Sequence, residues 1–204
     1  MRARWIVLLA LSSAIVPACS SGGSDSAARV TTSTTARGAS ATTTTSSTTV
    51  PTTVAFDGTT ADATSKATAG STAFLRSIRV SHGDGVDRVT FQFDGSGRPA
   101  SAVGYVARPV ADGSGEAVAV QGAASLKVRL EPSSMTDLRG SSPIATYTGP
   151  DRVTGDSRVV TEVVKGGDFE GVVTWFVGVR RRAPFRIRVL TSTPSELTIE
   201  LAAP

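Results

Sequence analysis

Apolar and polar residues alternate with a period of two along several segments in the last two thirds of the chain. Successive side chains of a β-strand point to opposite faces, so this pattern places one set of side chains in a core and the other in water. Residues 88–94 show the pattern clearly, because Val89, Phe91 and Phe93 occupy every second position. We predict a strand in each segment of this kind, namely 88–94, 126–131, 185–189 and 196–201.

A different segment, 172–179, is apolar at nearly every position and predicts a central strand covered on both faces. Residues 133–139 fit one short turn of helix, capped by Ser133 or Ser134. About eight short strands at close spacing predict one all-β domain over residues 73–204, a β-sandwich or partly open barrel. The remaining predicted strands are 74–80, 103–110 and 158–165, and the predicted turns are 82–85, 94–97, 112–115 and 166–168.

The composition changes abruptly before residue 73. Residues 20–72 consist mainly of Ser, Thr, Ala and Gly, and they lack the apolar periodicity that would stabilise an ordered backbone. We therefore predict a disordered Ser/Thr-rich linker over residues 19–72, with a root-mean-square span of about 40 Å. Two interpretations of its composition remain open, an unmodified spacer and an O-glycosylated stalk.

The first 18 residues have the layout of a secretory signal peptide, with a basic start, an apolar core at 5–16 and a small-residue junction. The apolar core is shorter than the roughly 20 residues that a membrane-spanning helix needs. The junction Val-Pro-Ala-Cys at 16–19 resembles the lipobox of bacterial lipoproteins. It implies that Cys19 is the first mature residue and carries fatty acyl chains such as palmitate.

Cys19 is the only cysteine in the 204 residues, so the chain forms no internal disulfide. An exposed thiol on an exported protein is reactive unless it is chemically occupied, which favours lipidation over an ordinary signal peptide followed by a free thiol. We predict a protein attached by its lipid to the extracytoplasmic face of the cell membrane.

The charge of the chain argues against nucleic acid as a partner. The formal net charge is +4, and the predicted signal peptide accounts for two of the positive charges. Charges of opposite sign balance in the linker, which leaves the folded domain at +2. This value is too small for the basic patch that nucleic-acid binding requires.

Three segments resemble the AMIN-like domain of actinobacterial lipoproteins: 81–95, 173–187 and 190–201. The third departs from the family pattern, because Ser195-Glu196 stands where a Pro-Arg pair is common. The resemblance implies a β-sandwich in a cell-envelope protein. The wider AMIN group is attached to cell-wall amidases and secretion pores, so the resemblance also implies binding of peptidoglycan or a related envelope glycan.

Catalytic chemistry finds little support in the residues. His82 is the only histidine, so a zinc site with several His or Cys ligands cannot be built. The chain has no G-x-S-x-G nucleophile motif and no phosphate-binding glycine motif. We predict no enzyme activity, no metal and no cofactor. A glycan hydrolase stays as a third alternative that needs two acids facing one groove, drawn from Asp84, Asp87, Asp112, Asp168 and Glu170.

Arg180, Arg181 and Arg182 form the one local concentration of charge, and we name them with Trp175 as candidate ligand-binding residues. Adjacent guanidinium groups can bind carboxylates or phosphates. The alternatives are a hairpin tip kept soluble by charge for the arginines, and a place in the core for Trp175. We predict a non-enzymatic module that binds an envelope glycan or, alternatively, an envelope protein partner.

Overall fold

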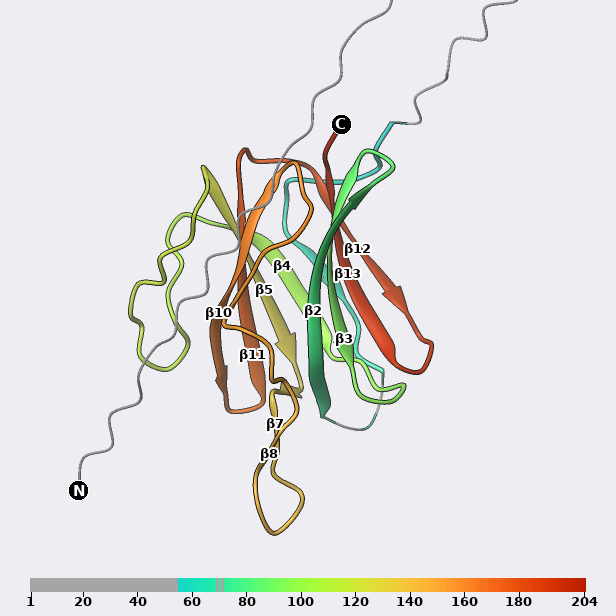
Figure 1. Ribbon diagram of the computed structural model, residues 1–204, viewed down its shortest axis with the longest axis vertical. Coiled ribbons are helices and arrows are strands. Elements are labelled where there is room, and N and C mark those ends of the chain that lie inside the picture. The colour runs from blue at the N-terminus through green and yellow to red at the C-terminus, as the bar shows by residue number, and fades with distance from the viewer. Residues whose placement is uncertain (1–54, 69, 71) are drawn as a thin grey trace, which may run out of the picture. The chain divides into compact units, whose positions relative to one another are not determined.

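Two mainly antiparallel β-sheets face each other in the computed structural model, which describes residues 55–68, 70 and 72–204 (Figure 1). The predicted signal peptide and Cys19 lie outside the described residues. The described part is all-β and contains no helix, and the predicted β-sandwich is confirmed. Its eight longer strands are β2 (Ala73–Gly83), β3 (Val86–Phe93), β4 (Ala100–Val106), β5 (Ala124–Glu131), β10 (Val160–Phe169), β11 (Val172–Val179), β12 (Phe185–Leu190) and β13 (Ser195–Ala202).

Five shorter strands complete the described fold: β1 (Ala63–Ser65), β6 (Ser133–Ser134), β7 (Thr136–Asp137), β8 (Ile144–Ala145) and β9 (Arg152–Val153). One sheet has six strands in the order β1-β4-β5-β11-β10-β9, and the other has five in the order β12-β13-β3-β2-β6. The strands β7 and β8 form a separate hairpin that projects from one end of the sandwich (Figure 1). Among the residues that the structure describes, no helix is long and apolar enough to cross a membrane.

The core lies between the two sheets and is built from the alternating segments. The strands β3, β5, β12 and β13 match the predicted segments, and their apolar positions face inward except Val189 near the end of β12, which is exposed. Antiparallel pairing of β13 with β3 sets Leu197 opposite Phe91, and both side chains are fully buried. This confirms the interpretation of the period-two pattern as one buried and one solvated face.

The apolar strand β11 is central, as its sequence predicts. It pairs with β5 on one side and with β10 on the other. Its inward side chains enter the core, and loop 107–123 folds over its outer face, where Gly178 lies against the carbonyl of Gln121. Phe176 is buried on that outer face against Gly166. Cover on both faces explains why this strand is apolar throughout.

Two local predictions are wrong. Residues 133–139 form β6 and β7 instead of a helical turn, because β6 pairs with β2 and the Ser133 hydroxyl donates to the Ala73 carbonyl at 2.8 Å. The predicted turn at 166–168 lies inside β10, and the chain reverses at Glu170-Gly171. Gly166 is required there by close packing, since a Cβ would meet the ring of Phe176 at 2.7 Å.

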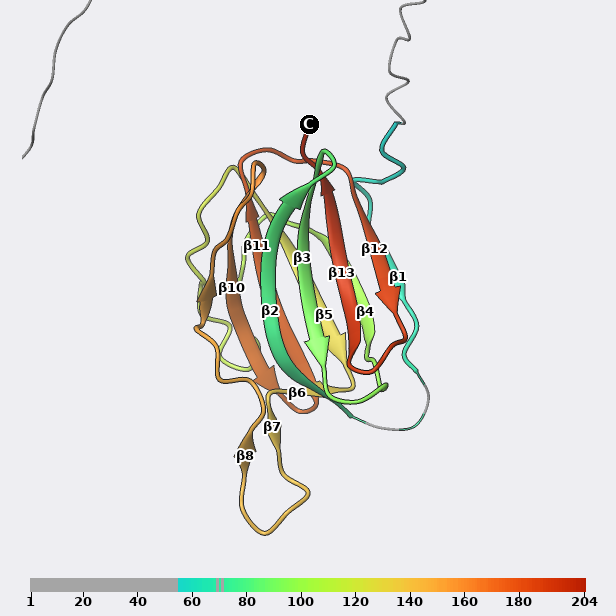
Figure 2. The same ribbon diagram turned by 45° about the vertical axis from the view of Figure 1, so that its right-hand side comes forward.

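The predicted linker, residues 19–72, extends too far toward the C-terminus, because part of it belongs to the sandwich. Strand β1 pairs with β4, and Thr59 pairs with Phe185 at the start of β12. The guanidinium of Arg98 also donates to the Lys66 carbonyl at 2.6 Å. These bonds order residues 59–66 by pairing them with the edges of the two sheets. The segment is Ser/Thr-rich and has no apolar periodicity that could have predicted this order. Figure 2 shows β1 beside β12, where it closes one side of the sandwich.

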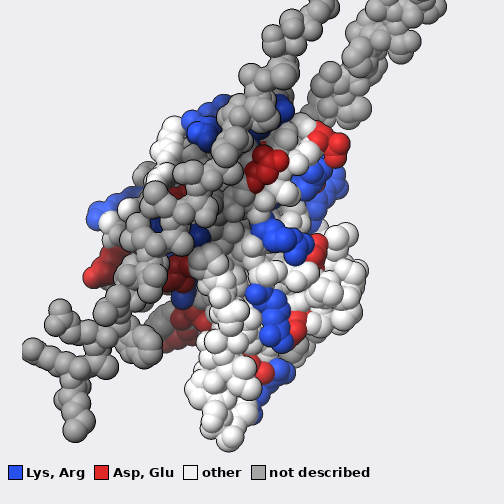
Figure 3. Space-filling view, viewed as in Figure 1, with Lys and Arg blue, Asp and Glu red and all other residues white. Residues whose placement is uncertain are grey.

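The two ends of the sandwich differ in character. We call the end that carries loops 83–86, 154–159 and 180–184 and the C-terminus the upper pole, and the end that carries the β7–β8 hairpin the lower pole (Figures 1 and 2). Figure 3 shows Lys and Arg side chains interspersed with Asp and Glu over the visible face, while much of the hairpin at the bottom is white. The arginines singled out by sequence lie at the upper pole, in the loop between β11 and β12.

Candidate functional site

The arginines 180–182 occupy the loop between β11 and β12 at the upper pole, and we call residues 180–184 the arginine loop. Buried side chains anchor both of its ends, because Val179 and Ala183 are in the core. Tyr105 fixes the loop from β4: its hydroxyl donates to the Ala183 carbonyl at 2.7 Å and accepts from the Ala183 amide at 2.9 Å. The loop is thus held by specific contacts at the edge of the core.

All three arginine side chains are exposed and are bonded to main-chain carbonyls. Arg180 donates from Nε to the Arg158 carbonyl at 3.1 Å, and from its amide to the Val159 carbonyl at 2.8 Å. Arg181 donates from Nη2 to Ala202, and Arg182 from Nη2 to Thr60 at 3.2 Å. A guanidinium has five N–H donors, so each keeps donors free for a ligand.

None of the three guanidiniums pairs with a carboxylate within the described residues. The arginines on the outer face of the five-stranded sheet behave differently. There Glu200 accepts from Arg186 at 2.7 Å and from Arg88 at 3.2 Å. Burial raises the pKa of Glu200, but the bonds from the two arginines outweigh burial and hold the pKa below its usual value. The sheet-face charges are therefore neutralised internally, whereas those of the arginine loop are available.

A groove of about 820 Å³ opens beside the arginine loop. Its lining comes from the end of β4, the start of β5, loop 107–123 and Arg182. The guanidinium carbon of Arg182 lies 4.5 Å from the centre of the Tyr105 ring. Burial raises the pKa of Tyr105, against smaller opposing effects of the Ala183 bond and the nearby arginines, so its phenol stays protonated at neutral pH. The structure thus places the Tyr105 ring under Arg182.

Trp175 is part of the core and not of a ligand site. Its side chain is 0% exposed, and its indole packs edge to face on Tyr147 with ring centres 5.4 Å apart. The proposal of Trp175 as a ligand-binding platform is therefore wrong. Trp175 is buried because its side chain points inward from β11, where it lies opposite Val128 of β5.

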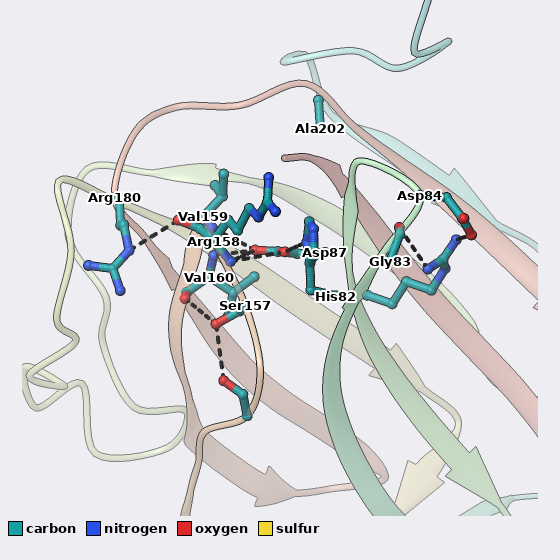
Figure 4. Close-up of polar contacts among 12 residues, drawn as sticks. His82, Gly83, Asp84, Asp87, Ser157, Arg158, Val159, Val160, Arg180 and Ala202 are labelled. Atoms are coloured by element: carbon teal, nitrogen blue, oxygen red, sulfur yellow. Dashed lines mark hydrogen bonds and ion pairs between the residues drawn. The ribbon is translucent and has the colours of Figure 1, made fainter. Parts of the chain in front are cut away.

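Asp87, which the sequence offers only as a candidate hydrolase acid, has a structural role instead, and Figure 4 shows its contacts. It is fully buried, and its carboxylate accepts from the amides of Arg158, Val159 and Val160 at 2.6–3.1 Å. His82, its cross-strand partner, donates from Nδ1 at 2.7 Å. This clamp ties β3 to the start of β10. It also fixes the carbonyls of residues 158 and 159, which receive Arg180.

The acids considered for a glycan hydrolase have other partners. Asp87 is saturated by its clamp, and Asp168 accepts from the Met135 amide at 2.8 Å. Asp112 lines a shallow depression with Glu170, but it pairs with Lys127 at 3.1 Å. Asp84 is almost fully exposed at the β2–β3 turn. No group of three or more His, Cys, Asp or Glu side chains in the described ranges is arranged to hold a metal ion.

Comparison with known families decides the classification. The family model of the AMIN-like domain matches residues 73–203, most of the chain and nearly all of the sandwich. The chain belongs to the AMIN-like domain family. AMIN-like domains are generally non-catalytic binding modules of envelope or periplasmic proteins. The match begins after β1, so this strand lies outside the shared region. Neither a curated protein nor a solved structure matches the chain.

Proposed function

We propose that this AMIN-like protein is a lipid-anchored, non-enzymatic module that binds peptidoglycan through the arginine loop and the groove beside it. The observation that carries the proposal is the set of three exposed guanidiniums that are held by main-chain carbonyls and have no carboxylate partner in the described part of the chain. Peptidoglycan is rich in carboxylates from its peptides. Charge-assisted bonds to carboxylates are among the stronger hydrogen bonds that a protein surface makes.

The N-terminal segment supports the same location. The junction at 16–19 and the single Cys19 favour lipid attachment on the outside of the membrane. The predicted Ser/Thr-rich linker, most of which lies outside the described residues, would join this anchor to the sandwich. A sandwich on such a linker stays near the membrane and reaches the wall.

Replacing Arg180, Arg181 and Arg182 together by Gln should strongly reduce the fraction of protein that sediments with purified peptidoglycan. The unfolding temperature should stay nearly unchanged, because exposed charges contribute little to stability. Wild-type binding should also weaken with added salt, since exposed charges are screened over about 8 Å at physiological ionic strength.

The matched control for this variant changes three other exposed arginines to Gln: Arg76, Arg79 and Arg188 on the outer face of the five-stranded sheet. It alters the net charge by the same amount at a different place, and each of these arginines lies near a carboxylate. Equal loss of sedimentation in both variants would mean that overall charge drives binding. Full binding by the 180–182 variant would contradict the proposed site.

Replacing Cys19 by Ala should release the protein from the membrane fraction or leave it unprocessed. The reason is that stable membrane attachment needs at least two acyl chains or an equivalent second anchor, and Cys19 is the only thiol that can carry them. Fractionation of cells that express each form, with mass spectrometry of the mature N-terminus, measures the effect. An unmodified Cys19 in the native mature protein would overturn lipid anchoring.

The lower pole favours a second function, binding of an envelope protein. Leu138 and Ile144 on the β7–β8 hairpin are 69% and 62% exposed, although large apolar side chains are usually buried. Phe169 and Leu190 are also exposed at this pole. Exposed apolar groups of this kind often mark protein contacts. Leu138→Ser combined with Ile144→Ser tests this second function, and it should leave sedimentation with peptidoglycan unchanged.

A further inference from the structure

The groove beside the arginine loop has an unusual lining for a carbohydrate site. Most of its side chains are small or aliphatic, including Pro109, Val118 and Val120. Tyr105 is the one aromatic residue among the described lining residues, and Arg182 covers its ring. Sugar rings bind well to an open aromatic face. The groove offers no such face.

The lining of the groove also carries very little charge. Arg182 is the one charged residue among those that the structure describes in the lining. It is held by Thr60 and by the Tyr105 ring, and Tyr105 is held in turn by Ala183. A guanidinium fixed in this way can accept a carboxylate with little loss of side-chain freedom. The groove therefore suits a ligand that places one carboxylate on Arg182 and uncharged groups along the rest of the lining.

An extended peptide with a free carboxyl group has this chemistry. The lining residues Ala119, Gly122 and Ala123 are small, so the main chain of a bound peptide can come close to the main chain of the protein. The volume of about 820 Å³ lies in the range of ligand sites and is large enough for a short peptide.

We infer that the groove binds the peptide part of peptidoglycan, with a peptide carboxylate on Arg182, and that it does not bind the glycan strand. This inference rests on the proposed function and specifies which chemical class the site recognises. Arg182 contacts the ligand, while Tyr105 acts as a positioning residue through its bonds to Ala183.

The test uses residues 19–204, expressed without the predicted signal peptide and with Cys19 replaced by Ala, and three probes. They are peptides released from purified peptidoglycan by an amidase, the same peptides with their carboxyl groups amidated, and a neutral N-acetylglucosamine tetramer. Calorimetry or NMR titration should show binding of the free peptides only. Amidation should weaken binding by about tenfold or more, which corresponds to one lost charge-assisted hydrogen bond.

Three variants separate the groove from general charge. Arg182→Gln should weaken peptide binding by about tenfold or more. Ala119→Phe, at an exposed position of the groove wall, should also weaken it because the larger ring fills the groove. Arg188→Gln on the outer sheet face should bind peptides like the wild type. Unchanged unfolding temperatures would show that all three variants are folded.

The outcomes distinguish this inference from the proposed function. The wild-type protein could sediment with intact peptidoglycan and yet fail to bind the free peptides, or it could bind the neutral tetramer instead of the peptides. Either result would overturn the inference and leave the proposed function standing. Peptide binding that is insensitive to both Arg182→Gln and Ala119→Phe would also overturn it. If the wild-type protein does not bind intact peptidoglycan, the proposed function itself is overturned.

Discussion

Replacing Asp87 by Asn should lower the free energy of unfolding by about 2–4 kcal/mol, a large part of the stability of a domain this size. The carboxylate of Asp87 is fully buried and accepts three main-chain N–H bonds and one from His82. An asparagine loses the negative charge and turns an amide NH₂ toward N–H donors. Urea or guanidinium unfolding of the two proteins at pH 7 measures the difference.

The matched control is Asp84→Asn in the adjacent turn. Asp84 is exposed, and its φ of 54° is a conformation that Asn also accepts. Its replacement should change the free energy of unfolding by no more than about 0.5 kcal/mol. Equal effects of the two substitutions would contradict the clamp at Asp87.

The same clamp predicts a pH dependence of stability. Burial raises the pKa of Asp87, but the bonds from Val160, Val159, Arg158 and His82 together outweigh burial and hold the pKa below its usual 3.8. A carboxyl whose pKa is lowered by folding stabilises the protein above the unfolded pKa, and that stability is lost as the pH falls through the folded pKa. The difference between wild type and Asp87→Asn should therefore shrink below about pH 4. A constant difference between pH 7 and pH 3 would refute this assignment.

Replacing Trp175 by Ala should lower the free energy of unfolding by about 3–5 kcal/mol, because it leaves a large cavity in the core. Trp175 is completely buried on the central strand and packs on Tyr147. Thermal or denaturant unfolding measures the loss. The protein that remains folded should bind peptidoglycan normally, since Trp175 does not reach the groove beside the arginine loop.

Phe169→Ala is the matched aromatic control for Trp175. Phe169 lies at the end of β10 and is 51% exposed, so its loss should change stability by less than about 1 kcal/mol. A small effect of Trp175→Ala together with lost peptidoglycan binding would restore Trp175 as a ligand residue.

The fold was predictable where one face of a strand is buried and the other is solvated. Residues 88–94 and 196–201 follow this rule and form β3 and β13. The rule fails where distant partners hold the chain, as at 133–139, where β2 and Asp168 bind a segment that local pattern assigns to a helical turn. It also fails at β1, which is ordered by pairing with β4 and has no apolar period.

The candidate site was predictable only in part, for the same physical reason. A run of three arginines after an apolar strand predicts an exposed charged loop, and the structure places Arg180–Arg182 in such a loop. The clamp of Asp87 joins residues about 70 positions apart, which no local pattern reveals. The groove is likewise assembled from β4, β5 and Arg182, and its shape depends on the fold of loop 107–123.

The most direct test of the central claim is amide hydrogen exchange of the mature protein with and without soluble peptidoglycan fragments. We predict new protection of residues 105–125 and 180–184, the walls of the groove and the arginine loop, and little change elsewhere. The protection should disappear in the variant that carries Gln at positions 180–182. Protection confined to the β7–β8 hairpin or to the outer face of the five-stranded sheet, or no protection at saturating fragment concentrations, would contradict the account.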